Sequence, residues 1–84
     1  MATINWKASA QRAQAEGYLP GNHWEQMLRR GMNDSLKVEL QRTGDLEAYL
    51  QTRTHRAMEE YDRLLEEGTP PQTARELALE DLLG

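Results

Sequence analysis

Apolar residues recur at helical spacing along most of the chain, and the clearest run lies between residues 46 and 67. Its members fall three or four residues apart, except across a polar gap at 51–56. This spacing predicts a long amphipathic helix over 46–67. A last helix over 70–83 is expected to pack against it. The two expected apolar stripes are Leu46, Tyr49, Leu50, Ala57, Met58, Tyr61, Leu64 and Leu65, and then Ala74, Leu77, Ala78 and Leu82.

Three weaker helical segments are expected earlier in the chain, over 3–16, 23–30 and 35–43. The first is rich in alanine, with Trp6 as its one bulky residue, so we expect it to bury little and to be the most mobile. Glycines that follow helix-compatible stretches are expected to end helices, because glycine readily adopts a positive φ. These are Gly17, Gly31, Gly44 and Gly68.

Helix starts are expected where a capping side chain precedes each apolar run, at Asn22 with Glu25, at Asp45, and at Thr69 before Pro70 in the first helical position. Whether Gly31 ends a helix or kinks it is open, although Asn33 and Asp34 favour a fresh start. Ile4 and Val38 are the sole Val or Ile residues of the chain, so strands are not expected. The prediction is one all-α domain over 1–84, a small bundle of four or five short helices with one long central helix.

The apolar content is low for a chain of 84 residues, with 38% hydrophobic residues and no Phe. A chain of this size buries only about 60% of its unfolded surface. Either a few aromatic anchors hold the core or a second copy covers exposed apolar faces, and we expect self-association as a homodimer. The expected anchors are Trp6, Tyr18, Trp24, Tyr49 and Tyr61.

Cysteine is absent, which excludes disulfides, thiolate zinc sites and a cysteine nucleophile. The first residues lack the apolar run of a signal peptide, and no stretch has the length of an apolar membrane span. We therefore expect a cytoplasmic protein without a membrane partner.

One group of side chains has a spacing that suits metal ligation. On a helix, His55, Glu59 and Asp62 would share one face. Known patterns require a further ligand, either an acid three residues before the histidine, where Thr52 stands, or a second histidine four residues away. An exposed, salt-bridging face is therefore favoured over a metal site. The other acids of 59–67 crowd the same helix without a nucleophile or phosphate motif, so we expect no enzyme activity, no catalytic residue, no metal and no cofactor.

Charge divides the chain into two opposite halves. Residues 1–42 hold six Lys and Arg against four Asp and Glu, whereas residues 43–84 hold four against ten. A basic cluster near His23 and Trp24 could contact a phosphate backbone or an acidic protein, and the pI of about 5.1 argues against nucleic acid. The cluster consists of Arg29, Arg30, Lys37 and Arg42.

Methionines beside this cluster could form an adaptable apolar face, although such a stripe is more often part of a core. Plain solvation is the alternative reading of the basic residues. The residues expected to bind a partner are Trp24, Met27, Leu28, Arg29, Arg30, Met32 and Lys37.

The arrangement Leu36-x3-Leu40-Gln41-Arg42-Thr43-Gly44-Asp45-Leu46-x2-Tyr49-Leu50, continuing to Ala57-x-Glu59 and Leu64, resembles the TnpV family of small transposon-encoded helical proteins. The similar part covers residues 27–68 and centres on a Thr-Gly-x-Leu turn between two helices. The chain departs from the family before Trp24 and after Gly68. The resemblance implies an association with mobile elements and supplies no catalytic residues.

Together these features predict a non-enzymatic helical protein-interaction module, an accessory or regulatory protein of bacterial or mobile-element type. It would act by docking a helical face onto another protein or onto its own copy. The alternative is a small DNA-associated regulator, antitoxin-like or repressor-like, in which the basic cluster around Arg29 and Arg30 touches phosphates. Salt dependence separates the two, because phosphate contacts weaken steeply as salt rises.

Overall fold

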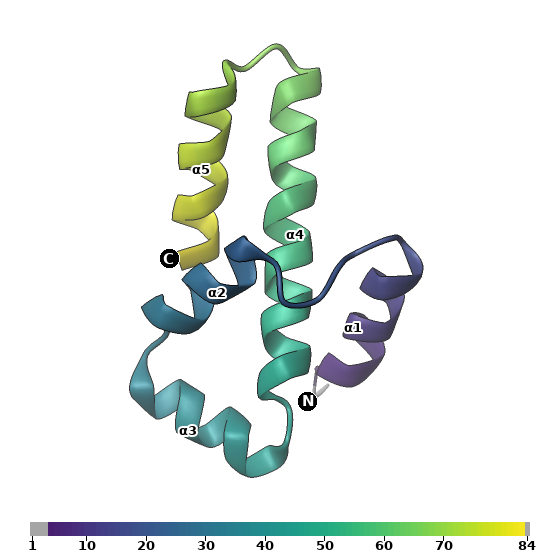
Figure 1. The fold of residues 1–84 in the computed structure, drawn as a ribbon, viewed down its shortest axis with the longest axis vertical. Coiled ribbons are helices and arrows are strands. Elements are labelled where there is room, and N and C mark those ends of the chain that lie inside the picture. Colours follow the sequence, from purple (N-terminus) through teal and green to yellow (C-terminus); the bar gives the residue numbers. More distant parts are fainter. Residues whose placement is uncertain (1–3, 84) are drawn as a thin grey trace.

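The computed structural model describes residues 4–83, which form five helices (Figure 1). Within this range there is no strand, and the predicted all-α class is confirmed. The helices are α1 (Trp6–Ala15), α2 (His23–Gly31), α3 (Asp34–Thr43), α4 (Leu46–Glu66) and α5 (Pro71–Leu83).

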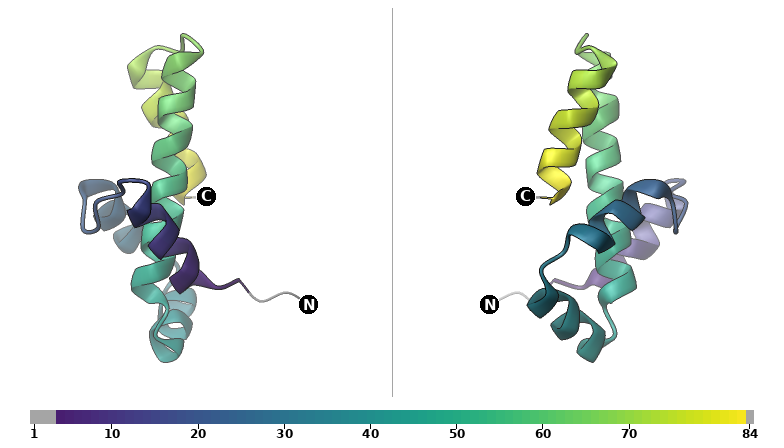
Figure 2. Two further views of the ribbon diagram at one scale, coloured as in Figure 1. Left: turned by 90° about the vertical axis from the view of Figure 1, so that its right-hand side faces the viewer. Right: turned by 60° about the vertical axis from the view of Figure 1, so that its left-hand side comes forward.

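Helix α4 is the central element, with 21 residues, and it contacts each of the other four helices. Helix α5 runs back antiparallel beside it, and α1 packs on the opposite side (Figures 1 and 2). Helices α2 and α3 lie across the first half of α4, and α2 also touches α5. The core therefore follows one face of α4 from Leu46 to Ala57 and closes with Leu28, Leu40 and Leu82.

The polar gap that interrupts the apolar spacing of α4 is bridged by Thr54, which is fully buried. Its methyl group continues the apolar face between Leu50 and Ala57. Beyond Ala57 the stripe becomes only partly buried, at Met58, Tyr61 and the two leucines that follow. The predicted stripe is thus mainly intramolecular packing.

Small side chains let α1 and α5 approach α4 closely. Ala10 and Ala13 of α1 are buried, as are Ala74 and Ala78 of α5. Helix α1 also places Trp6 edge-on against Tyr49, with 4.8 Å between the ring centroids. The alanine-rich helix therefore buries a continuous face, more than its lack of large side chains suggested.

Leu77 does not belong to the buried stripe of α5, and this expectation was wrong. Its exposed fraction is 46%, whereas Ala78 is fully buried and Leu82 is 1% exposed. Spacing by four along Ala74, Ala78 and Leu82 sets the contact line with α4, and Leu79 is the leucine that packs at its edge.

Asparagine side chains cap three of the helices. The Oδ1 atoms of Asn5, Asn22 and Asn33 accept backbone N–H bonds from the first turns of α1, α2 and α3. The cap at Asn33 resolves the open boundary, because it starts a separate helix after Gly31. Helix α1 begins at Trp6, and the expected start at Thr3 lies outside the described residues.

Three boundary expectations need correction. Asp45 precedes α4 but makes no side-chain capping bond. Pro71, not Pro70, is the first residue of α5, since the carbonyl oxygen of Pro70 accepts the N–H of Ala74 as a cap residue does. Gly31 ends α2 without a positive φ, unlike Gly44, whose φ of 79° closes α3. The role of Gly31 is instead spatial, because a Cβ there would lie 3.0 Å from Cδ2 of Leu83.

Between residues 4 and 83, no helix combines the length and the apolar character that crossing a membrane requires.

Candidate functional site

A small hollow lies where α2 meets α3, next to the first half of α4 and the C-terminal end of α5. Its volume is about 160 Å³, and we call it the α2–α3 hollow. Exposed apolar groups remain at its edge, since Leu36 is 39% and Leu83 46% exposed. Its lining residues are Leu28, Gly31, Met32, Asn33, Leu36, Tyr49, Arg53, Leu82 and Leu83.

Arg53 reaches this hollow from the polar gap of α4. Its guanidinium donates to the carbonyl oxygens of Asp81, at 3.3 Å, and Leu82, at 3.1 Å, at the C-terminal end of α5. It also lies 5.9 Å from the ring centroid of Tyr49. A cation is favourable there because the last carbonyl groups of a helix carry partial negative charge. Arg53 thus ties α5 to α4 and adds positive charge to the hollow.

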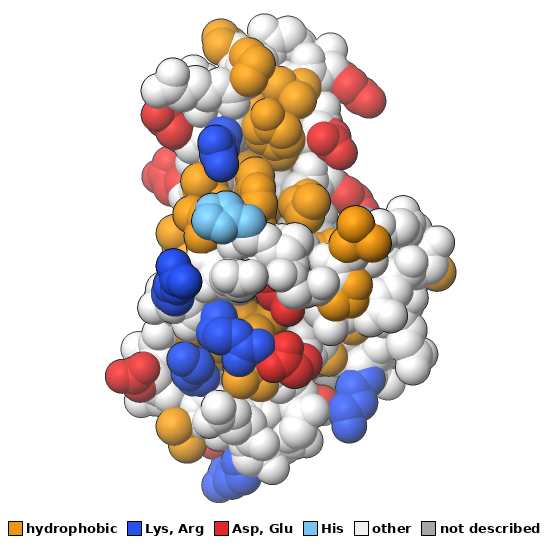
Figure 3. All heavy atoms as spheres, viewed as in Figure 1, with side chains coloured by type: hydrophobic (Ala, Val, Ile, Leu, Met, Phe, Trp, Pro, Cys, Tyr) orange, Lys and Arg blue, Asp and Glu red, His pale blue; other side chains and the backbone are white. Residues whose placement is uncertain are grey.

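Two further cations stand next to lining residues in sequence, Arg30 beside Gly31 and Lys37 beside Leu36. Within residues 4–83 neither forms an ion pair, whereas Arg29 pairs with Glu47. Figure 3 shows several Lys and Arg side chains gathered over α2 and α3, with apolar side chains between them. The hollow thus has apolar edges and one cation in its lining, with two further cations next to lining residues in sequence.

The residues predicted to bind a partner are only partly brought together. Met32 lines the hollow, and Arg30 and Lys37 are the sequence neighbours of the lining residues Gly31 and Leu36. Leu28 lines it from within the core at 3% exposure, so it packs against the protein itself. Trp24 does not line it and instead meets Tyr61 at 5.7 Å between ring centroids. Met27 is partly buried and is also absent from the lining.

Sequence patterns missed the lining residues that come from α3, α4 and α5. Tyr49 had been assigned to the apolar stripe of 46–67 and Arg53 to its polar gap, whereas Leu36 was named only in the family resemblance and Leu83 only as the end of the last helix.

A buried carboxylate, that of Glu25, lies in the first turn of α2. Its exposure is 4%, and its Oε2 accepts hydrogen bonds from the Tyr18 hydroxyl at 2.6 Å and the Gly21 N–H at 3.0 Å. Burial raises the pKa of the Tyr18 hydroxyl well above its ordinary value of 10.0, and the hydrogen bond to Glu25 raises it further. The network fixes the loop that leads into α2.

Acidic side chains near the end of α4 form ion pairs at the surface. Arg63 pairs with Glu60 one turn before it and with Glu67, at 2.6 Å, one turn after it. The hydrogen bond from Arg63 lowers the pKa of Glu60. Arg63 and Glu67 are exposed, and Glu60 is partly exposed.

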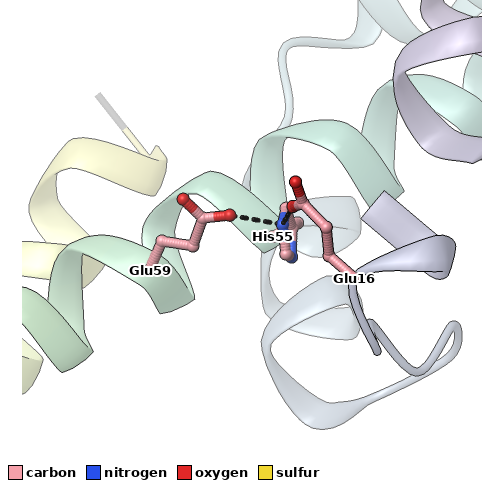
Figure 4. Close-up of side chains that lie close together, drawn as sticks. All are labelled: Glu16, His55 and Glu59. Carbon is pink, nitrogen blue, oxygen red and sulfur yellow. Dashed lines mark hydrogen bonds and ion pairs between the residues drawn. The ribbon is translucent and has the colours of Figure 1, made fainter. Parts of the chain in front are cut away.

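The face of His55 and Glu59 gains a third side chain that the sequence could not supply. Glu16, at the end of α1, lies with its Oε2 2.8 Å from Nε2 of His55, and Oε1 of Glu59 lies 2.5 Å from the same nitrogen (Figure 4). Asp62 lines the same hollow, of about 280 Å³, but is not part of this cluster. We call this space the α1–α4 hollow; it is also lined by Gly17, Tyr18, Leu19, Asn22 and Met58.

No model of a protein family, no curated protein and no solved structure matches the chain.

Proposed function

We infer that the protein is a non-enzymatic interaction module that binds an acidic, partly apolar protein segment at the α2–α3 hollow. The observation that supports this most is the combination of exposed apolar edges, at Leu36 and Leu83, with cations that have no acidic partner within residues 4–83, at Arg30 and Lys37. Protein interfaces commonly join an apolar centre to a polar rim. Charges at such a rim speed encounter and select the partner.

The size of the hollow favours a protein partner over a small molecule. Pockets for metabolites usually exceed about 300 Å³, and this one is about 160 Å³. It suits one apolar side chain inserted as an anchor from a partner surface.

Ion pairs within the protein weaken the DNA-binding alternative. Of the four predicted phosphate contacts, Arg29 is paired with Glu47 and Arg42 with Glu39. Phosphate binding by these two would compete with the neighbouring carboxylates. Arg30, Lys37 and Arg53 are left as cations without an acidic partner among the described residues, which suits a local acidic contact better than a run of phosphates.

A second copy of the chain is the first partner to test, because residues 43–84 carry the excess of acids. In a two-fold dimer each hollow would face an acidic part of the other copy. This keeps the predicted homodimer within the proposal. An accessory role alongside a mobile element, which the TnpV resemblance implies, is a further part of it.

The test is the solution mass by light scattering across a concentration series at low and high salt. The parent is compared with Arg30→Glu/Lys37→Glu and with Lys7→Glu/Arg12→Glu, which makes the same charge change on exposed residues of α1. We expect a parent dimer that weakens with salt, at least tenfold weaker association in the first variant, and little change in the second. A parent that is monomeric throughout, or equal effects of both variants, contradicts self-association at this hollow. Binding of duplex DNA that falls steeply with salt would support the regulator instead.

A further inference from the structure

Two carboxylates converge on one ring nitrogen in the cluster of Glu16, His55 and Glu59. Glu59 lies one helical turn after His55 on α4, and Glu16 approaches from the end of α1, 39 residues away in sequence. The three ligand atoms lie within 4.8 Å of one another. The close-up shows both carboxylates pointing toward the same imidazole edge (Figure 4).

One N–H of the imidazole cannot give each of the two carboxylates a full hydrogen bond. Nε2 carries at most one hydrogen and can donate it to one carboxylate oxygen. When Nε2 carries the hydrogen, the two carboxylate oxygens share that single N–H, and when it does not, both oxygens face the nitrogen lone pair. A cation placed among the three atoms would be bound by all of them at once.

The burial of the histidine also favours a bound ion over a chance surface contact. The His55 side chain is 19% exposed, while those of Glu16 and Glu59 are 54% and 61% exposed. The ring is held edge-on by Tyr18, with 5.6 Å between the centroids. One ligand is thus fixed at the wall of the α1–α4 hollow, and two mobile carboxylates can adjust around it.

We propose that Glu16, His55 and Glu59 form a binding site for a divalent transition-metal ion of the zinc type, which fastens the end of α1 to α4. An imidazole nitrogen with carboxylate oxygens is a donor set that Zn²⁺ accepts, and water completes the coordination. Zinc bonds of about 2.0–2.1 Å to nitrogen and oxygen in tetrahedral geometry place ligand atoms about 3.3 Å apart. The two N–O separations, 2.8 and 2.5 Å, therefore open by about 0.5 and 0.8 Å, which the exposed glutamates achieve by side-chain rotation.

The sequence-based expectation of no metal rested on the lack of an acid three residues before His55 and of a second histidine four residues away. The structure supplies a further ligand, Glu16, from the residue that caps the end of α1. The site shares no residue with the lining of the α2–α3 hollow, so it stands apart from the proposed function. Its role would be mechanical, because α1 contacts α4 and no other helix among the described residues.

The test is a calorimetric titration of ZnCl₂ into the chelator-treated full chain. We expect one ion per chain, at least about tenfold weaker binding in Glu16→Gln and in His55→Ala, and a higher Tm of the parent when zinc is present. His23→Ala, which removes the other histidine, and Glu66→Gln, which removes an exposed acid of α4 outside the cluster, should bind zinc as the parent does.

Three results would overturn the proposal. They are the absence of stoichiometric zinc binding by the parent, binding that His23→Ala abolishes, and binding that Glu16→Gln leaves unchanged. Far-ultraviolet circular dichroism of the zinc-free variants shows whether they fold. Should His55→Ala fail to fold, Glu16→Gln decides alone, because its side chain is exposed and nearly the same in shape.

Discussion

Replacement of Tyr18 by phenylalanine removes a single hydroxyl from the buried contact with Glu25. Tyr18 is 6% and Glu25 4% exposed, and their oxygens lie 2.6 Å apart. A hydrogen bond to a charged group contributes about 1.5–3 kcal/mol. The Gly21 N–H continues to donate to the same oxygen, so we expect Tyr18→Phe to lower the free energy of unfolding by about 2 kcal/mol.

Such a loss is large for a domain of 84 residues, whose total stability should be about 4–13 kcal/mol. It corresponds to a fall in Tm of about 8–16 °C. Urea unfolding followed by the fluorescence of Trp6 and Trp24 measures it. Tyr61→Phe is the matched control, since Tyr61 is partly buried and its hydroxyl has no hydrogen bond to the residues that the structure describes. Equal costs of the two substitutions would refute the reasoning.

A double-mutant cycle with Glu25→Gln isolates the pair. If the hydroxyl acts through the carboxylate, the two substitutions together should cost less than the sum of their separate effects, with a coupling of about 1 kcal/mol or more. Additive losses of stability would show that the Tyr18 hydroxyl does not act through Glu25.

The raised pKa of Tyr18 adds a dependence on pH to the same comparison. The folded state holds the phenolic proton more tightly than the unfolded state. Above about pH 10 the unfolded chain therefore binds fewer protons, and stability falls as pH rises. Below that pH the contribution is intact. The difference in stability between the parent and Tyr18→Phe should narrow above about pH 10, and a constant difference would contradict the assignment.

Two further substitutions test the packing of α5. Leu82→Ala should lower the free energy of unfolding in urea by about 2–5 kcal/mol, because the side chain is 1% exposed. Leu77→Ala should lower it by less than about 1 kcal/mol. Similar losses in the two variants would mean that Leu77 is part of the core. Gly31→Ala should stabilise the protein by about 0.5 kcal/mol, since alanine favours a helix by up to about 1 kcal/mol and the new Cβ meets only the end of the exposed Leu83 side chain. A lower urea midpoint would show that Leu83 cannot move aside.

Most of the fold follows from local signals. Apolar spacing located α4, and asparagines at helix starts located α2 and α3, because capping is decided within one turn of chain. The failures are also local in origin. Asp45 and Pro70 were assigned by residue type, whereas the geometry of each turn decides which group caps and which proline begins the helix.

The candidate sites were less accessible to sequence patterns. The α2–α3 hollow joins residues from four helices, and Glu16 meets His55 across 39 positions. Such contacts depend on how helices cross, which helical spacing leaves open. The sequence indicated which face of a helix a residue occupies more readily than which residues of other helices it contacts.

Helix α1 rests on α4 alone among the described residues, whereas α2 and α5 support each other as well. The free energy of opening should therefore differ across the molecule, since a segment with one neighbour can separate without unfolding the rest. Departure of α1 would uncover the side of α4 that Ala10 and Ala13 cover and leave the α4–α5 hairpin in place. The protein would then present a second apolar surface, whose exposure is set by how firmly one short helix is held.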